Sequence, residues 1–457
     1  MKVVKKYDNI KVLVLGLAKS GLSAGKLLHQ LGAIVTVNDG KDFDENPEAQ
    51  QLLALGVKVI TGSHPTELLD EDFELVVKNP GIPYDNPMVV KALDKGLPVI
   101  TEVELAYQIS EAPIIGITGT NGKTTTTTMI AQVLNEGRER QFAYLAGNIG
   151  KVASQVAQSV TEENVMVTEL SSFQLMGIEE FHPQVAVITN LYEAHLDYHK
   201  NRGNYISAKW QIQKNMTPSD HLILNFDQKE LRDLSKKTRA SILPFSRKDT
   251  LSNGVYIKHG EIFYQEEKIM NSADLGVPGE HNLENALAAI AVAKLYGVSN
   301  AVIKKSLSTF SGVAHRLEYV GIVAGRKVYN DSKATNILAT ETALHSFENQ
   351  KNQVILIAGG LDRGNDFESL EKSLAGIKAG VFYGETKNKL MKTAQDVGIQ
   401  LIEKTDVLDE AVQAAFDFSE PGDIILFSPA CASWDQFTNF EIRGDKFKTL
   451  IKNLEKE

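Results

Sequence analysis

The sequence predicts a mostly parallel α/β protein built from three domains. Short apolar strands, loops and helices alternate through almost all of its 457 residues, which is the pattern of parallel sheets covered by helices. A chain of this length exceeds one ordinary hydrophobic core. We therefore place the domains at residues 1–108, 109–312 and 313–457.

The first section begins with a pattern that is typical of nucleotide binding. Residues 12–15 are an expected strand, 16–21 a turn and 22–31 a helix, and a second strand at 34–37 ends at Asn38-Asp39. An acid after the second strand suits a βαβ unit that holds a nucleotide, but the turn lacks the spacing G-x-G-x-x-G. We predict a phosphate-containing ligand here, and the alternative is that Asp39 is a plain turn residue.

A rigid loop follows the next expected strand, residues 75–77. Its sequence, KNPGIP at residues 78–83, contains two prolines that fix the backbone. Ligands of open α/β sheets bind at the carboxyl ends of strands, so this loop is a second candidate for ligand contact.

The second section opens with the most informative stretch, the run TGTNGKT at residues 118–124. An expected strand at 114–117 precedes it, and an expected helix at 129–134 follows the threonines. In such a turn the backbone N–H groups and the helix N-terminus hold phosphates, the lysine reaches them, and the threonine hydroxyl can bind Mg²⁺. The strict pattern G-x-x-x-x-G-K-[ST] needs glycine at Ile117, so the alternative is a glycine-containing turn without a ligand. The order of strand, Lys-Thr and helix favours a nucleoside triphosphate.

Polar side chains follow the next two expected strands. Strand 165–170 carries Glu169 near its end, and strand 185–190 is followed by Glu193, His195, Asp197 and His199. A carboxylate at a strand end beside a phosphate loop suits metal binding. The alternatives are a surface charge for Glu169 and a structural role for His195.

Two further positions are interpreted from local pattern. Asn282 precedes an expected helix at 283–295, so we predict that it caps this helix, although Asn285 is placed to face the same ligand. Lys209 reads, by itself, as a solvated helix lysine. The third section has expected strands at 354–358, 380–383, 399–402 and 423–428, and polar loops at 330–336, 359–363 and 428–435.

Composition restricts the class of protein. The formal net charge of -10 argues against nucleic-acid binding and requires local cationic pockets for an anionic substrate. The single cysteine, Cys431, excludes an internal disulfide and suits a reducing compartment. No apolar run approaches the ~20 residues of a membrane helix, and the N-terminus reads as a strand and not as a signal peptide. We expect a cytoplasmic monomer without membrane insertion.

Together these segments resemble the Mur ligases of bacterial peptidoglycan synthesis, over essentially the whole chain. Residues 118–124 are similar to the family's phosphate loop, which also lacks glycine at the position of Ile117. Residues 190–195, 279–285 and 330–336 are similar to shared ligase motifs, and residues 428–444 to the members that add D-glutamate. The resemblance implies a Rossmann-like N-terminal domain, a central P-loop ATPase-like domain and a Rossmann-like C-terminal domain.

The resemblance implies a peptide synthase, an ATP-dependent ligase that uses ATP and a pair of Mg²⁺ ions. ATP would phosphorylate the carboxylate of UDP-N-acetylmuramoyl-L-alanine to an acyl phosphate. The amine of D-glutamate would attack it, and a tetrahedral intermediate would release phosphate. The reaction would belong to cytoplasmic peptidoglycan precursor synthesis, and hence to cell wall biogenesis, cell shape, cell division and the cell cycle.

The resemblance also implies roles for individual residues. The catalytic residues would be Lys123, Glu169, His195 and Lys209. The metal ligands would be Thr124, Glu169, His195 and Lys209, the lysine being carbamylated so that it carries a carboxylate. The ATP contacts would be Gly119, Thr120, Asn121, Gly122, Lys123, Thr124, Thr125, Asn282, Arg316, Asp331 and Lys333. The contacts of the UDP-substrate would be Ser20, Asp39, Gly81, Asn148 and His195. The D-glutamate contacts would be Thr335, Arg363, Ser433, Trp434 and Phe440, with Arg363 and Trp434 standing where a lysine and an aliphatic residue are expected.

Three alternatives remain. A folylpolyglutamate synthase shares the phosphate loop, but it is not expected to carry a nucleotide-sugar section like residues 1–108. Other Mur ligases add L-alanine, a diamino acid or a dipeptide. A P-loop regulator that switches on ATP would not need the polar loops of the third section.

Overall fold

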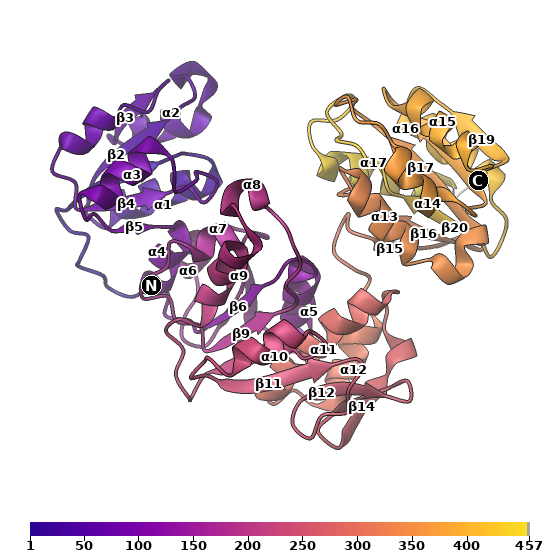
Figure 1. Cartoon of the computed structure of the whole chain (residues 1–457), viewed down its shortest axis with the longest axis horizontal. Coiled ribbons are helices and arrows are strands. Elements are labelled where there is room, and N and C mark those ends of the chain that lie inside the picture. Colours follow the sequence, from indigo (N-terminus) through magenta and orange to yellow (C-terminus); the bar gives the residue numbers. More distant parts are fainter. Residues whose placement is uncertain (455–457) are drawn as a thin grey trace. The chain divides into compact units, whose positions relative to one another are not determined.

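The computed structural model describes residues 1–454, and the chain folds into two compact units (Figure 1). Unit 1 comprises Met1–Asp274 and Leu283–Leu307, and unit 2 comprises Leu275–Asn282 and the residues from Ser308 on. Three sheets form, and each takes all its strands from one of the three predicted sections, which confirms the α/β class. No helix among residues 1–454 is long and apolar enough to cross a membrane.

The first sheet has five parallel strands in the order β3-β2-β1-β4-β5. The strands are β1 (Lys11–Leu15), β2 (Ile34–Asp39), β3 (Lys58–Thr61), β4 (Leu75–Lys78) and β5 (Val99–Ile100). The helices are α1 (Lys19–Gln30), α2 (Pro47–Ala54), α3 (Pro87–Asp94) and α4 (Glu102–Ile109). Strand order reverses between β3 and β4, so the carboxyl ends of β1 and β4 flank the switch point where such sheets bind ligands.

The second sheet has nine strands in the order β14-β13-β12-β11-β10-β9-β6-β8-β7. The strands are β6 (Ile114–Thr118), β7 (Ala143–Gly147), β8 (Val165–Glu169), β9 (Val185–Ile188), β10 (His221–Asn225), β11 (Ser241–Ser246), β12 (Val255–Lys258), β13 (Glu261–Tyr264) and β14 (Glu267–Asn271). The helices are α5 (Lys123–Asn135), α6 (Ala153–Ala157), α7 (Ser172–Leu175), α8 (Leu196–His199), α9 (Arg202–Trp210), α10 (Lys229–Ser235), α11 (Glu280–Leu295) and α12 (Asn300–Ser308). Strand β6 pairs in parallel with β8 and β9, so the ends of these three strands meet at one edge.

The third sheet lies in unit 2 and has the order β15-β16-β20-β17-β18-β19. The strands are β15 (Glu318–Val323), β16 (Arg326–Asn330), β17 (Val354–Gly359), β18 (Ala379–Tyr383), β19 (Leu401–Lys404) and β20 (Ile424–Phe427). The helices are α13 (Ile337–His345), α14 (Glu371–Leu374), α15 (Lys387–Asp396), α16 (Leu408–Phe418) and α17 (Phe440–Leu454). Buried residues of α13, α14 and α15 form the core on one face, and those of α16 and α17 form it on the other.

Three helices begin earlier than predicted. Helix α1 begins at Lys19, so Ser20 lies in its first turn and not in the preceding loop. Helix α5 begins at Lys123 and includes the threonine run, because threonine hydroxyls can bond to the carbonyl four residues back, as Thr127 does to Lys123 at 2.8 Å. Helix α11 begins at Glu280, so the prediction that Asn282 caps it is wrong.

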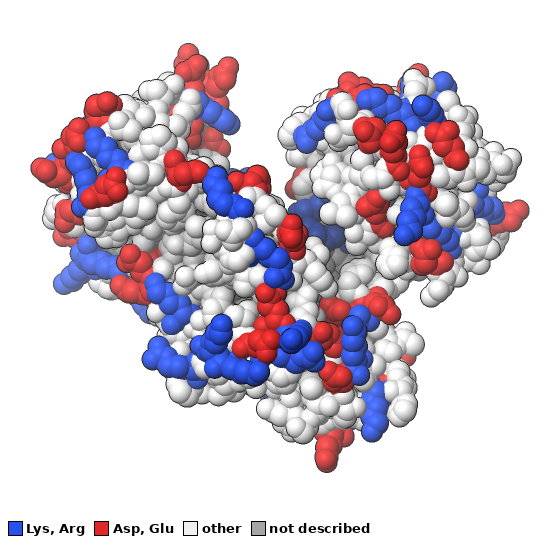
Figure 2. All heavy atoms as spheres, in the orientation of Figure 1, with Lys and Arg blue, Asp and Glu red and all other residues white. Residues whose placement is uncertain are grey.

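Charged side chains are interspersed on the surface. Figure 2 shows acidic and basic residues mixed over the face in view. This mixture follows from a composition of 48 Lys and Arg against 58 Asp and Glu. Any strongly cationic ligand pocket must therefore be built locally, by residues held inside loops.

Candidate functional site

The phosphate loop between β6 and α5 has two positions that only glycine can occupy. Gly119 has φ +146°, and a Cβ there would lie 2.0 Å from Thr189 Oγ1. Gly122 has φ +77°, and a Cβ there would lie 2.1 Å from Asn285 Oδ1. The loop is therefore pressed against the end of β9 on one side and α11 on the other. Asn285, 3% exposed, also accepts a hydrogen bond from Thr126 Oγ1 at 3.1 Å.

The loop is held by side chains from the end of β9. Asn121 N donates to Asn190 Oδ1 at 2.8 Å, and Asn190 Nδ2 donates back to Asn121 O at 3.2 Å. Thr120 N donates to Asn190 O at 2.9 Å, and Tyr205 Oη donates to Thr120 Oγ1 at 3.0 Å. These bonds fix the loop in the conformation that presents its amides. The sequence pointed to Asn190 only as part of a motif, and it gave no sign of Tyr205.

Two lysines contact this loop. Lys123 Nζ donates to the carbonyls of Gly119 and Thr120, at 3.0 and 2.8 Å. Lys209 Nζ, from α9, donates to Gly119 O at 2.7 Å and lies 4.8 Å from the centre of the Tyr205 ring. Lys209 is only 2% exposed, so the prediction of a solvated helix lysine is wrong. Burial, and then the charge of Lys123, hold the pKa of Lys209 well below its usual range.

The burial of Lys209 has a signal in the sequence. Tyr205, Ala208 and Ile212 are buried, and Lys209 falls between them at the spacing of one helix face. A lysine inside such an apolar stripe is a candidate for a functional group.

The two carboxylate oxygens of Glu169, at the end of β8, differ in their hydrogen bonding. The residue is 2% exposed, and its Oε1 accepts a hydrogen bond from Asn148 Nδ2 at 2.9 Å. Its Oε2 is buried without a hydrogen-bond partner in the described residues. An unsatisfied buried carboxylate oxygen is costly unless a cation meets it. The placement thus fits a metal ion, as the sequence predicts.

The donor set near Glu169 suits Mg²⁺ and not a metal held by protein alone. Within residues 1–454 no three His, Cys, Asp or Glu side chains gather closely enough to hold a metal. Magnesium commonly uses one or two carboxylates together with phosphate oxygens and water. Glu169 and the buried hydroxyl residue Thr124, in the first turn of α5, provide such a set.

His195 directly precedes α8, as its N-cap residue, in a left-handed conformation with φ +55°. Its ring packs edge-on against Phe173, with centroids 5.1 Å apart. Desolvation, and then the charge of Lys209, lower the pKa of His195. A neutral imidazole is the form that binds metals, so the environment is compatible with the predicted role.

The structure brings together most of the residues predicted to bind the UDP group. Asn79 Nδ2 donates to Ser20 Oγ at 3.2 Å, and Gly81 N donates to Asn79 Oδ1 at 3.0 Å. Asp39 Oδ2 accepts from Leu17 N at 2.7 Å and so braces the turn after β1. These residues lie at the switch point of the first sheet. Asn148, which is predicted to contact the muramoyl part of the substrate and not the UDP group, donates a hydrogen bond to Glu169.

In unit 2, Asp331 follows β16 and is 6% exposed. It accepts hydrogen bonds from Leu317 N at 3.0 Å and from Ser428 Oγ at 2.9 Å, and burial raises its pKa to about 7. Lys333 Nζ lies 5.1 Å from the centre of the Phe440 ring. Arg316 has a buried Nε for which the described residues offer no hydrogen bond.

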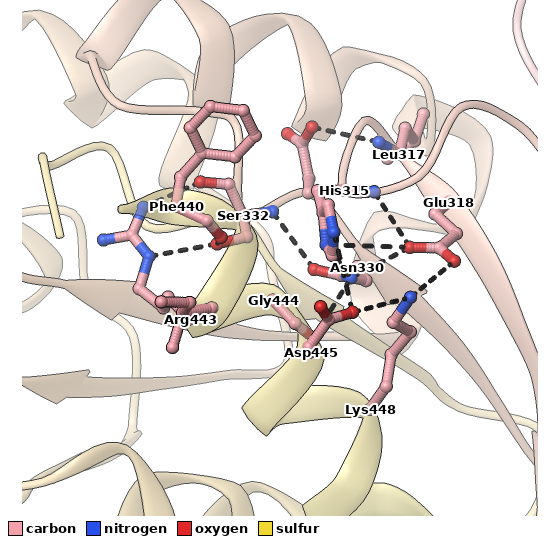
Figure 3. A network of polar contacts seen from close by, with 12 residues as sticks. His315, Leu317, Glu318, Asn330, Ser332, Phe440, Arg443, Gly444, Asp445 and Lys448 are labelled. Carbon is pink, nitrogen blue, oxygen red and sulfur yellow. Dashed lines mark hydrogen bonds and ion pairs between the residues drawn. The ribbon is translucent and has the colours of Figure 1, made fainter. Parts of the chain in front are cut away.

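A polar network next to Asp331 ties the turn at residues 315–318 to α17 (Figure 3). His315 N and Asn330 Nδ2 both donate to Glu318 Oε2 at 2.9 Å. Lys448, on α17, pairs with Glu318 and with Asp445 at 3.2 Å each. The network holds the turn that contains Arg316.

Arg443, on α17, joins two of the three polar loops of unit 2, those at residues 330–336 and 428–435. It is fully buried, and its guanidinium donates to Ser332 O at 2.7 Å and to Cys431 O at 3.0 Å. Cys431 is 4% exposed, and burial raises the pKa of its thiol to about 11. The role of Arg443 was missed, because an isolated helix arginine has no sequence signal for burial.

The residues predicted to bind D-glutamate are brought together only in part. The Arg363 guanidinium lies 4.8 Å from the centre of the Trp434 ring, which is 64% exposed. The two residues that depart from expectation therefore contact each other. Ser433 is 2% exposed, and Thr335 is half-buried near Asp331 in the chain.

Comparison with known proteins gives a consistent picture. Residues 10–101 match the family model of the Mur ligase MurD-like N-terminal domain, 117–293 that of the Mur ligase middle domain, and 315–431 that of the Mur ligase glutamate ligase domain. The chain is 61% identical over 454 residues to a UDP-N-acetylmuramoylalanine–D-glutamate ligase of Enterococcus faecalis, with 99% of both chains covered. It is 59% identical to the ligase of the same name from Streptococcus mutans, with 100% of both chains covered.

Solved structures share the fold at lower identity. The UDP-N-acetylmuramate-alanine ligase MurC of Thermotoga maritima matches with a TM-score of 0.58 and 20% identity, over 97% of this chain and 100% of that one. The MurF ligase of Thermotoga maritima, solved in complex with ADP, matches with a TM-score of 0.58 and 15% identity, over 100% and 97%. At these identities the likeness concerns the fold alone.

Proposed function

The chain belongs to the Mur ligase family, and we propose that it joins D-glutamate to UDP-N-acetylmuramoyl-L-alanine with ATP as the energy source. The observation that carries this proposal is identity near 60% with D-glutamate ligases over the full length of both chains. The MurD-like match at residues 10–101 supports it further, because a folylpolyglutamate synthase is not expected to have such a section. The reaction takes place in the cytoplasm as a step of peptidoglycan synthesis.

ATP lies over the loop of residues 118–124, with its phosphates at the N-terminus of α5. The loop amides and Lys123 hold the phosphates, and the aligned peptide dipoles of the 13-residue helix favour their charge. Glu169 and Thr124 would hold Mg²⁺, with His195 and a modified Lys209 as further ligands. A bound Mg²⁺ would supply positive charge that offsets the charge of the phosphates and of the substrate carboxylate.

The reaction begins when the substrate carboxylate attacks the γ-phosphorus of ATP. The bond to ADP breaks, and an acyl phosphate forms. The amine of D-glutamate then attacks the acyl carbon, and phosphate leaves from a tetrahedral intermediate. Lys123 and the loop amides offset the charge of the transferred group, which is the main demand that phosphoryl transfer makes on a protein.

Lys209 is carbamylated in the active enzyme. Only a neutral amine reacts with CO₂, and the lowered pKa of Lys209, caused by burial and then by the charge of Lys123, increases the share of that form. The product is a carboxylate, which fits the vicinity of Lys123 and a metal better than an ammonium does.

Unit 2 supplies the residues that bind D-glutamate, with Arg363 as the cation for a carboxylate and Trp434 beside it. Asp331, Lys333 and Arg316 assist ATP binding, as do Asn282 and Thr125. Arg363 donates through a planar fork, which favours a two-point contact that a lysine cannot make.

Product analysis tests this function. The protein is incubated with ATP, Mg²⁺, UDP-N-acetylmuramoyl-L-alanine and D-glutamate, and the product is weighed by mass spectrometry while phosphate release is followed. We expect one D-glutamyl residue to be added per phosphate released. Parallel reactions contain L-alanine, a diamino acid or a dipeptide in place of D-glutamate. If the protein ligates one of these alternatives and does not ligate D-glutamate, the proposal is contradicted. ATP turnover without any ligated product would contradict it as well.

A further inference from the structure

The loop of residues 79–83 is wrapped around a buried cation. Lys78 is 1% exposed, and its Nζ donates to the carbonyls of Asn79, Pro80 and Ile82 at 3.2, 3.3 and 2.7 Å. The Tyr84 ring lies on the same ammonium, 4.8 Å away. A loop with two prolines has few amides with which to bond its own carbonyls, so the lysine takes their place. Neither phosphate chemistry nor the metal site requires this lysine.

A tyrosine from the second section contacts the same loop. Tyr198, on α8, donates its hydroxyl to Ile82 O at 3.0 Å and receives a hydrogen bond from Lys78 Nζ at 3.4 Å. Two other contacts join residues just after this loop to the second section. Tyr84 Oη donates to Met176 O at 2.9 Å, and Lys200 pairs with Asp85 at 2.9 Å. All these residues belong to unit 1.

Aromatic rings connect Tyr198 to His195, a residue of the proposed metal site. The Tyr198 ring packs edge-on against Phe173, with centroids 4.5 Å apart, and Phe173 packs against His195 at 5.1 Å. Phe173 also stacks on His199, which is 3% exposed. Helix α8 is only one turn long, so its own hydrogen bonds cannot fix His195. The aromatic contacts and the Tyr198 hydroxyl supply that constraint.

We propose that Lys78 and Tyr198 are positioning residues that lock the loop of residues 79–83 to α8 and so set the reach from the bound uridine diphosphate to His195. The inference rests on the proposed function, in which Gly81 lies at the diphosphate. One end of the substrate is held by this loop, and its carboxylate must meet the γ-phosphate near His195. A displacement of about 1 Å at a reacting centre can lower a rate ~100-fold, so a fixed spacing has a direct catalytic value.

Tyr198→Phe is the sharpest test, because it deletes one hydroxyl and leaves the ring packed. The matched control is Tyr296→Phe, which deletes the hydroxyl of a tyrosine that packs against Phe142, outside this cluster. Calorimetry measures the affinity for UDP alone and for Mg²⁺ with a non-hydrolysable ATP analogue, and also counts functional sites. Steady-state kinetics give kcat and KM for UDP-N-acetylmuramoyl-L-alanine. Lys78→Met is the second variant, checked by thermal melting.

The expected result for Tyr198→Phe is a fall in kcat of about tenfold or more, with both affinities within twofold of wild type. Tyr296→Phe stays within twofold in every measurement. A kcat for Tyr198→Phe within threefold of wild type would overturn the inference. A loss of UDP affinity as large as the fall in kcat would also overturn the inference, because Tyr198 would then be a residue that binds the substrate. If the wild-type protein fails to ligate, the proposed function itself fails, which is a separate outcome.

Discussion

Lys123 and Lys209 donate to the same carbonyl oxygen, that of Gly119, over 3.0 and 2.7 Å. Two ammonium groups on one acceptor repel each other, and the more buried one loses its proton more readily. Lys209 is the buried member of the pair, at 2% exposed. Burial, and then the charge of Lys123, hold the pKa of Lys209 well below its usual range, so the two lysines on this carbonyl differ in acidity.

Lys209→Ala is expected to lower kcat at least ~100-fold, because it removes a group that the proposed metal site requires. Added bicarbonate should not restore activity. In wild type, ¹³C-labelled CO₂ should give a carbamate signal in the NMR spectrum that the variant lacks. Lys229→Ala, at an exposed helix lysine, is the control for both measurements. A variant with near-normal activity would remove Lys209 from the site.

Asn148→Ala is expected to raise the Mg²⁺ concentration needed for half-maximal binding of a non-hydrolysable ATP analogue by roughly 10–100-fold, the range typical of outer partners of metal ligands. The reason is that Asn148 Nδ2 orients Glu169 through its bond to Oε1 at 2.9 Å. Titration of Mg²⁺ against binding of the ATP analogue, without UDP-substrate, isolates this effect from any contact with the muramoyl group. An unchanged Mg²⁺ requirement would show that Glu169 is oriented without Asn148.

Gly122→Ala is expected to abolish tight ATP binding and to lower stability by more than the ~1–2 kcal/mol of a left-handed alanine. Its Cβ would lie 2.1 Å from Asn285 Oδ1. Gly137→Ala is a matched control, since Gly137 has φ +73° with nothing within 4 Å of a Cβ. Denaturant unfolding and nucleotide titration of both variants separate backbone strain from the clash. Equal effects of the two changes would be inconsistent with a tight fit at Gly122.

Glu102→Gln is expected to change how stability depends on pH. Glu102 is 2% exposed and accepts a hydrogen bond from Ser154 N, while its Oε2 is buried without a partner among residues 1–454. Burial raises the pKa of Glu102 from 4.5 to about 7. Because the pKa is raised in the folded state, the protonated Glu102 contributes to the stability of the fold. This contribution is complete below about pH 4.5 and is lost as pH rises through about 7.

Between pH 5 and 8, the free energy of unfolding of the wild type should therefore fall by on the order of 3 kcal/mol relative to that of Glu102→Gln. Urea unfolding across this range measures the difference. Glu163→Gln, at an exposed position, should follow wild type. Parallel curves for wild type and Glu102→Gln would mean that the carboxyl is not neutral in the folded protein.

Arg363 and Trp434 should be coupled by about 0.5–1 kcal/mol in D-glutamate binding, the usual strength of an exposed cation–π contact. Arg363→Lys and Trp434→Leu are measured alone and together, with KM for D-glutamate as the readout. We expect the double variant to be less impaired than the sum of the single ones. Strict additivity would indicate that the 4.8 Å contact plays no part in D-glutamate binding.

The strand pattern and the motif order were predictable because both are local in sequence. Strand β6, the turn after it and the Lys-Thr pair lie where the sequence pattern predicts them, and Glu169 lies at the end of β8 as expected. The start of α5 was not predictable, because a run of threonines has a low helix propensity. In this helix the hydroxyls of Thr127 and Thr128 bond to carbonyls of the preceding turn.

Contacts between distant segments escaped prediction. The burial of Lys209 depends on the shape of α9 against the phosphate loop, and that of Arg443 on two loops from different strands. Asn282 was misjudged because helix α11 begins two residues before it, at Glu280. For Arg443 the deciding partner, Ser332, lies far along the chain, where composition and periodicity carry no information.

The state of Cys431 has a practical consequence. Its thiol is 4% exposed, and with a pKa of about 11 it holds almost no thiolate at neutral pH. It is also the chain's single cysteine. Alkylating dyes and spin labels should thus react with a cysteine introduced at the surface and pass over the native one. The wild-type sequence is a ready background for site-specific labelling of either unit.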